Sequence, residues 1–150
     1  MNSAMSALIA RCNPSTAELS PALTKVVEEG VFCQQNLVLL ASQSRLVQSS
    51  VQEELGDETG YECFVNDLHL EDVLGPSTEC SQLEQALAFG RELARIWVNA
   101  GKDGSLLFII AGNEGEINIR FHRVRVGQAW LADDLETYRE PVAAIELRPV

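Results

Sequence analysis

An apolar stripe with helical spacing, between residues 78 and 101, constrains the fold more than any other feature of the sequence. Ser77 or Thr78 can cap a helix at its start, and Gly101 can end it. A stripe this long needs a broad apolar surface to cover it, so we expect the helix to pack across a sheet. The side chains of the stripe are Leu83, Ala86, Leu87, Gly90, Leu93, Ala94 and Trp97.

The last fifty residues predict the strands of that sheet. An apolar run over 105–111 precedes a turn sequence at 112–115, and Ile117, Ile119 and Phe121 then alternate with polar residues. This pattern predicts a hairpin with one buried face.

Beyond the hairpin the alternation breaks, because Arg123 and Arg125 fall on the buried parity. We therefore expect a bulge or a strand end near 122–124. A loop or short helical turn over 130–140 and a final strand over 142–147 complete the sheet.

Two breakers divide the first thirty residues. Asn-Pro-Ser-Thr at 13–16 interrupts a small, polar stretch, so we expect residues 1–19 to be a mobile lead-in. Ser20 and Pro21 have the form of a helix N-cap and its first residue, and Gly30 ends that short helix.

The next stretch predicts one more helix and one extended segment. Between Cys33 and Leu55 there is no Gly or Pro, and apolar residues recur at three-, four- or seven-residue steps, so we expect an amphipathic helix. Tyr61 to Leu70, after a turn cluster at 56–60, predicts a strand or extended segment. The chain is thus predicted to be a single α+β domain over 20–150, with N-terminal helices and one long amphipathic helix packed on a small antiparallel sheet.

Negative charge is concentrated in the middle of the chain. The chain has 11 Lys and Arg against 22 Asp and Glu, a formal net charge of −11. Residues 51–100 hold eleven acids and two bases, whereas residues 1–50 hold three of each. Phosphate is bound by Lys and Arg, so this charge disfavours a nucleic-acid partner. A hydrophobic fraction of 46% disfavours a disordered acidic tail.

The acids between residues 51 and 72 have no basic residue among them. A solvated face that keeps the protein soluble would explain them, but such a surface usually mixes both signs. A stretch of one sign favours a steering surface for a basic partner. The acids predicted to bind the partner are Glu53, Glu54, Asp57, Glu58, Glu62, Asp67, Glu71 and Asp72.

The stretch 130–138 combines two large aromatic side chains with three acids. This composition suits docking against a basic surface, although Trp130, Leu135 and Tyr138 can equally be core residues beneath the hairpin. The residues of this stretch predicted to bind the partner are Trp130, Asp133, Asp134 and Glu136.

No pattern in the chain predicts catalysis, a metal site or a cofactor. Asp67, His69 and Glu71 would share one side of a strand, but same-face side chains on a strand lie about 7 Å apart, which is wide for a shared metal ion. We therefore expect them to face solvent. His122 has no local catalytic partner and is expected on the hairpin surface. The glycines at 112–115 join two strands, whereas a phosphate loop needs a helix N-terminus.

The cysteines at positions 12, 33, 63 and 80 show no close pair and no adjacent histidines. We interpret them as reduced thiols rather than a zinc or redox site, although a disulfide is geometrically possible. The apolar stretch near the N-terminus has no basic residue before it, unlike a secretory signal. No apolar run approaches the about twenty residues of a membrane-spanning helix. We expect a cytoplasmic protein without membrane association.

Residues 79–150 resemble a known class of protein. The long helix, the hairpin and the segment from Arg120 through Trp130 to Tyr138 resemble the C-terminal part of small acidic bacterial immunity proteins, which accompany contact-dependent or polymorphic toxins. The resemblance implies a cytoplasmic protein that binds and blocks one cognate toxin domain, usually a basic nuclease, and that has no catalysis of its own.

Three functions are compatible with the sequence. The leading hypothesis is a non-catalytic inhibitor that covers a basic toxin with the acidic residues of 53–72 and 133–136. A secretion chaperone or adaptor is also small, acidic and α+β, and would use exposed apolar grooves instead. The third is an enzyme or a small-ligand-binding protein that uses His69 or His122.

Overall fold

The computed structural model describes residues 1–47, 54 and 56–149 of the chain. The helices and strands are, in chain order, α1 (Ser3–Cys12), α2 (Pro21–Glu29), β1 (Val31–Gln34), β2 (Leu37–Leu40), the 3-10 helix η1 (Ala41–Leu46), α4 (Glu58–Val65), β3 (Leu68–His69), α5 (Leu70–Leu74), α6 (Glu79–Asn99), β4 (Leu106–Asn113), β5 (Glu116–Arg123), the 3-10 helix η2 (Leu135–Thr137) and β6 (Val142–Leu147).

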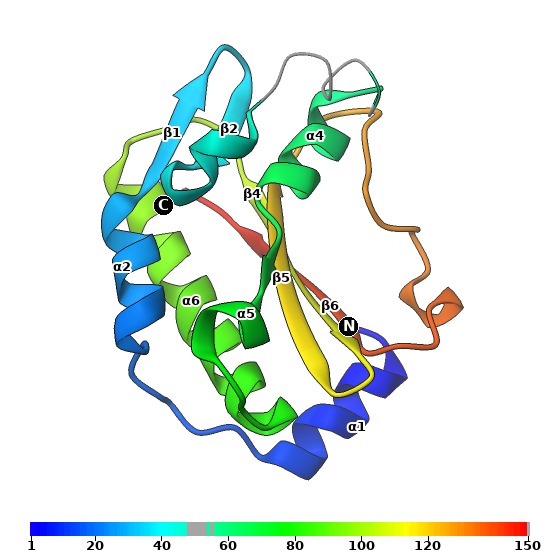
Figure 1. Ribbon diagram of the computed structural model, residues 1–150. Coiled ribbons are helices and arrows are strands. Elements are labelled where there is room, and N and C mark those ends of the chain that lie inside the picture. Colours follow the sequence, from blue (N-terminus) through cyan, green and yellow to red (C-terminus); the bar gives the residue numbers. More distant parts are fainter. Residues whose placement is uncertain (48–53, 55, 150) are drawn as a thin grey trace.

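A four-stranded sheet lies at the centre of the fold (Figure 1). Its strand order is β3-β5-β4-β6, and neighbouring strands are antiparallel. The strands β1 and β2 form a separate hairpin. The α+β class predicted from the sequence is confirmed.

The long helix α6 confirms the prediction from the apolar stripe. Thr78 caps it, because its hydroxyl accepts a hydrogen bond from the Ser81 amide at 3.2 Å. The stripe packs on the side of the sheet that carries Ile117, Ile119 and Phe121. The main hydrophobic core lies between this helix and the sheet, and α1 and α2 add apolar side chains to it.

The β4–β5 hairpin also follows its prediction. Asn113 pairs with Glu116, so the turn consists of Glu114 and Gly115, whose φ angles are 50° and 89°. Two consecutive residues with positive φ are typical of the type I′ turns that match the twist of a hairpin. β5 ends at Arg123, within the stretch where the alternation was expected to break.

The helix predicted over Cys33–Leu55 is wrong. Residues 31–34 and 37–40 form the hairpin β1–β2, and η1 follows. Leu37 and Leu39 enter a small cluster with Tyr61 and Val65, while Val38 and Leu40 enter the main core. Because the apolar run 37–40 is buried on both faces, its spacing is compatible with a strand and with a helix. The periodicity of the sequence therefore could not distinguish a strand from a helix here. The rest of the predicted helix, 48–53 and 55, lies outside the described residues.

The strand predicted over Tyr61–Leu70 is wrong except at β3. Asp57 caps α4 by accepting a hydrogen bond from the Gly60 amide at 2.7 Å, so the expected turn cluster begins a helix instead.

Two polar side chains of this region, Glu62 and Asn66, are four residues apart and reach the edge of β2. Glu62 accepts a hydrogen bond from the Val38 amide at 2.7 Å, and Asn66 accepts one from the Leu40 amide at 2.8 Å. A helix brings residues at this spacing to one face, whereas the ten-residue strand expected over 61–70 would separate them widely.

Residues 1–19 are not the loose lead-in that we expected. They contain α1, whose Met5 and Leu8 are buried in the main core. The amide oxygen of Asn2 accepts hydrogen bonds from the backbone N–H groups of Met5 and Val142, both at 3.0 Å. The start of the chain is therefore joined to the last strand.

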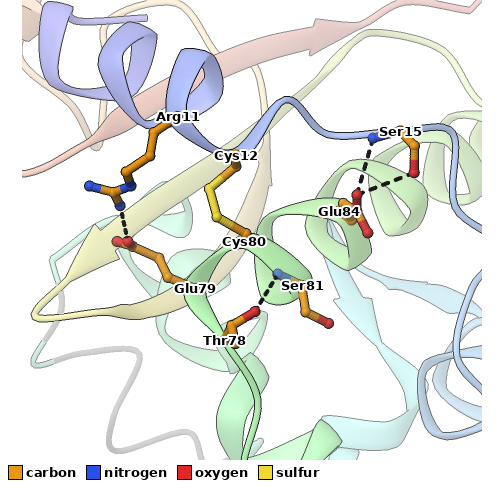
Figure 2. Close-up of a disulfide and its surroundings, with 8 residues drawn as sticks. All are labelled: Arg11, Cys12, Ser15, Thr78, Glu79, Cys80, Ser81 and Glu84. Carbon is orange, nitrogen blue, oxygen red and sulfur yellow. Dashed lines mark hydrogen bonds and ion pairs between the residues drawn. A yellow bond between two sulfur atoms is a disulfide. The ribbon is translucent and has the colours of Figure 1, made fainter.

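A disulfide between Cys12 and Cys80 joins the end of α1 to the start of α6, with the two Cα atoms 5.1 Å apart (Figure 2). The prediction that all cysteines are reduced thiols is therefore wrong for this pair, and Cys33 and Cys63 are free. The two half-cystines are 68 positions apart in the sequence, so the tertiary fold and not a local pattern brings them together.

Candidate functional site

The candidate site is the face of the four-stranded sheet that is turned away from α6. Because side chains alternate along β5, Arg120 and His122 lie on this outer face, opposite to Phe121 in the core. The segment 124–141, which we call the outer segment, runs beside the sheet and is orange in Figure 1. It contains little regular structure apart from η2.

Two hollows lie between the outer segment and the sheet, with volumes of about 320 and 330 Å³. Trp130 and Leu131 line both of them. The first hollow is also lined by His69, Asn118, Arg120, Tyr138 and Glu140. The second is also lined by Leu107, His122, Val124, Gln128, Asp133, Leu135, Ala144 and Glu146.

Side chains of α4 hold the beginning of the outer segment in place. The guanidinium of Arg125 donates to the two carboxylate oxygens of Glu62 at 2.6 and 2.8 Å. Gln128 accepts a hydrogen bond from the Thr59 amide at 3.2 Å and donates one to Glu58 at 2.7 Å. These contacts fix both ends of the turn formed by residues 125–128.

The end of the outer segment is held by the start of α1. The carboxylate of Glu136 accepts hydrogen bonds from the amide and the hydroxyl of Ser3, both at 2.7 Å. The side-chain amide of Asn2 donates to the carbonyl oxygen of Glu140 at 2.8 Å. Within the segment, the Tyr138 hydroxyl accepts a hydrogen bond from the Ala132 amide at 2.9 Å. The segment is thus anchored at both ends and braced between them.

Glu62 does not lie on a partner-facing surface, and that prediction is wrong. Its side chain is 0% exposed, and it accepts hydrogen bonds from Arg125 and from the Val38 and Arg123 amides. The hydrogen bond that Arg125 donates to Glu62 raises the pKa of Arg125 above its ordinary value, so the guanidinium is charged. Glu62 supports the outer segment from beneath.

Three other predicted acids also have internal partners. Asp67 accepts a hydrogen bond from Arg120 at 2.8 Å, and Asp57 caps α4. The hydrogen bond from Gln128 lowers the pKa of Glu58. Gln128 belongs to the outer segment and binds Glu58, while Arg120 of β5 binds Asp67 and also contacts Trp130 of the outer segment. These two residues therefore connect the acidic stretch 57–67 with the outer segment. In the sequence, the acids of these two regions were only two separate groups.

The remaining acids of the 51–72 stretch lie elsewhere. Glu71 is on α5, where a hydrogen bond with the Glu116 carboxyl raises the pKa of Glu71 above its ordinary value. Asp72 and Glu54 are exposed. Glu53 lies outside the described residues.

Trp130 is partly exposed rather than a core residue. Its side chain is 38% exposed, and the guanidinium carbon of Arg120 lies 5.3 Å from the ring centroid. This distance is within the range of a cation–π contact. Asp133 and Asp134 are exposed a few residues further on.

The histidines differ from each other in burial. His69 is exposed and lies 3.5 Å from the carboxylate of Asp67, while Glu71 belongs to the next helix. Among residues 1–47, 54 and 56–149, no group of three or more His, Cys, Asp and Glu side chains is arranged to hold a metal ion.

His122 is only 2% exposed, so its predicted place on the hairpin surface is wrong. The outer segment covers it, and it lines the second hollow. Its Nδ1 lies 2.8 Å from the carbonyl oxygen of Arg123. Its Nε2 is buried and has no hydrogen-bond partner in the part of the chain that the structure describes.

Three site residues were missed by the sequence analysis: Arg120, Arg125 and Gln128. The alternation along β5 placed Arg120 opposite the core, and the aromatic residues after it could have indicated that this face is covered. No pattern in the sequence indicated that Arg125 reaches Glu62 or that Gln128 reaches Glu58, since these contacts span more than sixty residues.

The fold and the site define a small acidic α+β protein with an anchored aromatic and acidic segment across one face of its sheet. The chain belongs to the uncharacterized protein PM0498 family, whose model matches residues 1–150. No curated protein and no solved structure matches it. Of the helices in the described ranges, none has the length and hydropathy needed to cross a membrane.

Proposed function

We propose that the protein is a non-catalytic binding protein that neutralises a basic protein domain, of the toxin class implied by the immunity-protein resemblance. The observation that carries the proposal is the position of Trp130. It stands partly exposed beside the exposed carboxylates of Asp133 and Asp134, on a segment anchored at both ends.

Anchoring of the outer segment favours tight binding. A segment that is already ordered loses little conformational entropy when it docks. The turn between Arg125 and Gln128 presents Val126 fully exposed at its tip, next to the partly exposed Val124. Apolar and aromatic groups at the centre of a contact, with charged groups at its rim, have the usual anatomy of a protein interface.

Charge supports a basic partner. Within the described residues, no ion pair involves Asp133 or Asp134. The Asp134 carboxylate accepts a hydrogen bond from the Glu136 amide at 3.0 Å, which leaves its charge uncompensated by any cation of the described residues. Complementary charge accelerates encounter and selects among partners, and its effect decreases with salt.

The proposal can be tested by co-producing the chain with the protein encoded by the neighbouring gene and measuring growth and complex formation. The double variant Asp133→Lys/Asp134→Lys should lose protection and binding, and the wild-type complex should weaken as salt rises. The matched control is Glu28→Lys/Glu29→Lys, which makes the same charge change on exposed residues of α2, away from the outer segment (Figure 1). Equal behaviour of the two double variants would overturn the proposal.

A secretion chaperone or adaptor is the second candidate, and the exposed apolar tip favours it. Such a protein would bind an apolar segment of its client through Val124, Val126 and the hollows beside Trp130. Val126→Asp would then abolish binding while the Asp133→Lys/Asp134→Lys variant kept it. For an inhibitor that depends on charge, the Asp133→Lys/Asp134→Lys variant abolishes binding and Val126→Asp keeps it.

The proposed role implies the cytoplasm, where toxin domains of this kind act. The Cys12–Cys80 disulfide favours an oxidising compartment instead, because disulfides are rare in the reducing cytosol. Fractionation of the native cell, with thiol alkylation before lysis, distinguishes the two. A reduced pair in the cytoplasmic fraction supports the inhibitor role, and an oxidised pair outside that fraction contradicts it.

A further inference from the structure

We infer that the second hollow binds an organic cation on a short aliphatic stem, such as an alkylguanidinium or alkylammonium group. The inference deepens the proposed function, because a basic partner carries this group on its Arg and Lys side chains. It rests on the proposed function only where it takes that partner as the source of the cation. The hollow lies between the outer segment and strands β4, β5 and β6.

The walls of the hollow suit an aliphatic stem. Leu107 and Ala144 contribute from β4 and β6, and Val124 and Leu135 contribute from the outer segment. Trp130 provides an aromatic surface, which attracts cations through the negative face of its ring. A volume of about 330 Å³ is within the usual range of small-ligand sites.

Among the described residues, the charged side chains that line the hollow are both carboxylates, Asp133 and Glu146, and no Lys or Arg lines it. Hydrogen bonds from Arg148 and Ser105 lower the pKa of Glu146, so it is ionised at neutral pH. Arg148 is largely exposed and does not line the hollow. Because Glu146 is ion-paired with Arg148 at 2.7 Å, the uncompensated negative charge at the rim is the carboxylate of Asp133.

His122 provides the observation that separates this hollow from an ordinary acidic patch. Because Nδ1 lies 2.8 Å from a carbonyl oxygen, which can only accept, Nδ1 carries a hydrogen. In the tautomer whose single hydrogen is on Nδ1, Nε2 is an acceptor, and it is buried without a partner in the described residues. An unsatisfied buried acceptor is costly, and an N–H group of a guanidinium or ammonium would satisfy it.

The first hollow provides an internal contrast. It contains Arg120, whose Nε is a buried donor without a partner in the described part of the chain. A guanidinium there would face a second guanidinium. The two hollows share Trp130, but the first is lined by the guanidinium of Arg120 as well as by the carboxylates of Glu116 and Glu140, whereas the charged groups of the described residues that line the second are carboxylates alone. An organic cation should therefore select the second.

The inference is tested by titrating the full-length, disulfide-intact protein with n-butylguanidinium chloride and following two-dimensional ¹H–¹⁵N NMR spectra. We expect saturable shifts at the Trp130 indole N–H and the Val124 amide, and a change in the ¹⁵N shift of His122 Nε2. The Trp97 indole, which donates to the Gly104 carbonyl at 2.9 Å in the core, should not move. n-Butanol, with the same stem and no charge, should bind at least about ten-fold more weakly.

Variants separate the groups that hold the cation. Asp133→Asn and Glu146→Gln should each weaken n-butylguanidinium about five-fold, since each removes one carboxylate at the rim. Asp72→Asn, the control, removes an exposed carboxylate of α5 and should leave the affinity unchanged. The inference is overturned if no saturable shift occurs, if n-butanol binds equally well, or if the three variants behave alike.

Two further ligands identify the source of the cation. N-acetyl-arginine N-methylamide represents a side chain of a protein partner, and putrescine represents a free polyamine. Tighter binding of the arginine derivative assigns the site to a partner, and tighter binding of putrescine assigns it to a free amine. Loss of protection by Asp133→Lys/Asp134→Lys tests the proposed function separately, so either conclusion can fail alone.

Discussion

The buried carboxylate of Glu62 binds the guanidinium of Arg125 through two hydrogen bonds, of 2.6 and 2.8 Å. The same carboxylate accepts hydrogen bonds from the Val38 and Arg123 amides, both at 2.7 Å. One side chain of α4 therefore joins the hairpin β1–β2, the end of β5 and the outer segment. Glu62 is therefore a positioning residue: it holds the outer segment in place for any binding by that segment.

Replacing Glu62 with alanine should be strongly destabilising. The change leaves the guanidinium of Arg125 and two backbone N–H groups without their acceptor, in a site where water has little access. Breaking one side of a buried ion pair costs about 3–5 kcal/mol. Urea unfolding measures the loss, and Glu28→Ala on the exposed face of α2 should stay within about 0.5 kcal/mol of the wild type. A loss below about 1 kcal/mol for Glu62→Ala would contradict this role.

The second half of the fold could be predicted because its signals are local. The period of α6, the turn at Glu114 and Gly115 and the alternation of Ile117, Ile119 and Phe121 each depend on residues that are close in sequence. Each signal also agrees with the tertiary packing, so nothing overrides it.

In the first half, the caps Ser20 and Gly30 correctly predicted α2, but the structure between Cys33 and Leu70 could not be predicted because its signals are ambiguous or distant. Leu37 to Leu40 are buried on both faces, which removes the alternation that identifies a strand. The helix α4 depends on Glu62 and Asn66 meeting the edges of β2 and β5, and no local pattern shows those edges.

The candidate site was predicted in part. Trp130, Asp133 and Asp134 lie together on the anchored segment, but Glu62 is buried and Glu136 binds the start of α1. A charge count treats every acid as exposed. It cannot show which acids meet an arginine or a helix terminus from another part of the chain.

The hydrogen bond between the Glu71 and Glu116 carboxyls predicts a specific pH dependence. Because this bond raises the pKa of Glu71 above 4.5, the folded protein holds that proton more tightly than the unfolded chain does. The pair therefore contributes stability at low pH, and this contribution is lost as the pH rises through the folded-state pKa. In a ¹³C NMR titration of the side-chain carboxyls, Glu116→Gln should lower the pKa of Glu71 towards 4.5. An unchanged pKa would show that Glu116 is not the cause.

The cysteines should differ in reactivity towards N-ethylmaleimide. Cys33 is exposed and should react in the folded, unreduced protein. Burial raises the pKa of the Cys63 thiol to about 12, so it should react only after unfolding. Cys12 and Cys80 should react only after unfolding and reduction. Mass spectrometry of purified protein should therefore count one, two and four modified cysteines in these three states, and two modified cysteines in the folded state would contradict the burial of Cys63.

Gly90 on α6 provides a test of the packing between the helix and the sheet. A Cβ atom at this position would lie 2.7 Å from Cε1 and 3.0 Å from Cδ1 of Phe108, whose ring is fully buried and stacks on Phe89. Gly90→Ala should gain about 1 kcal/mol in helix propensity, but overpacking costs about 1–3 kcal/mol, so we expect a net loss of stability. Phe108→Leu removes the ring that Cβ would meet, so the alanine should be better tolerated in that background. Urea unfolding of the wild type, the two single variants and the double variant measures the coupling between the two sites. Strictly additive effects would show that Gly90 is not required for the approach of Phe108 to α6.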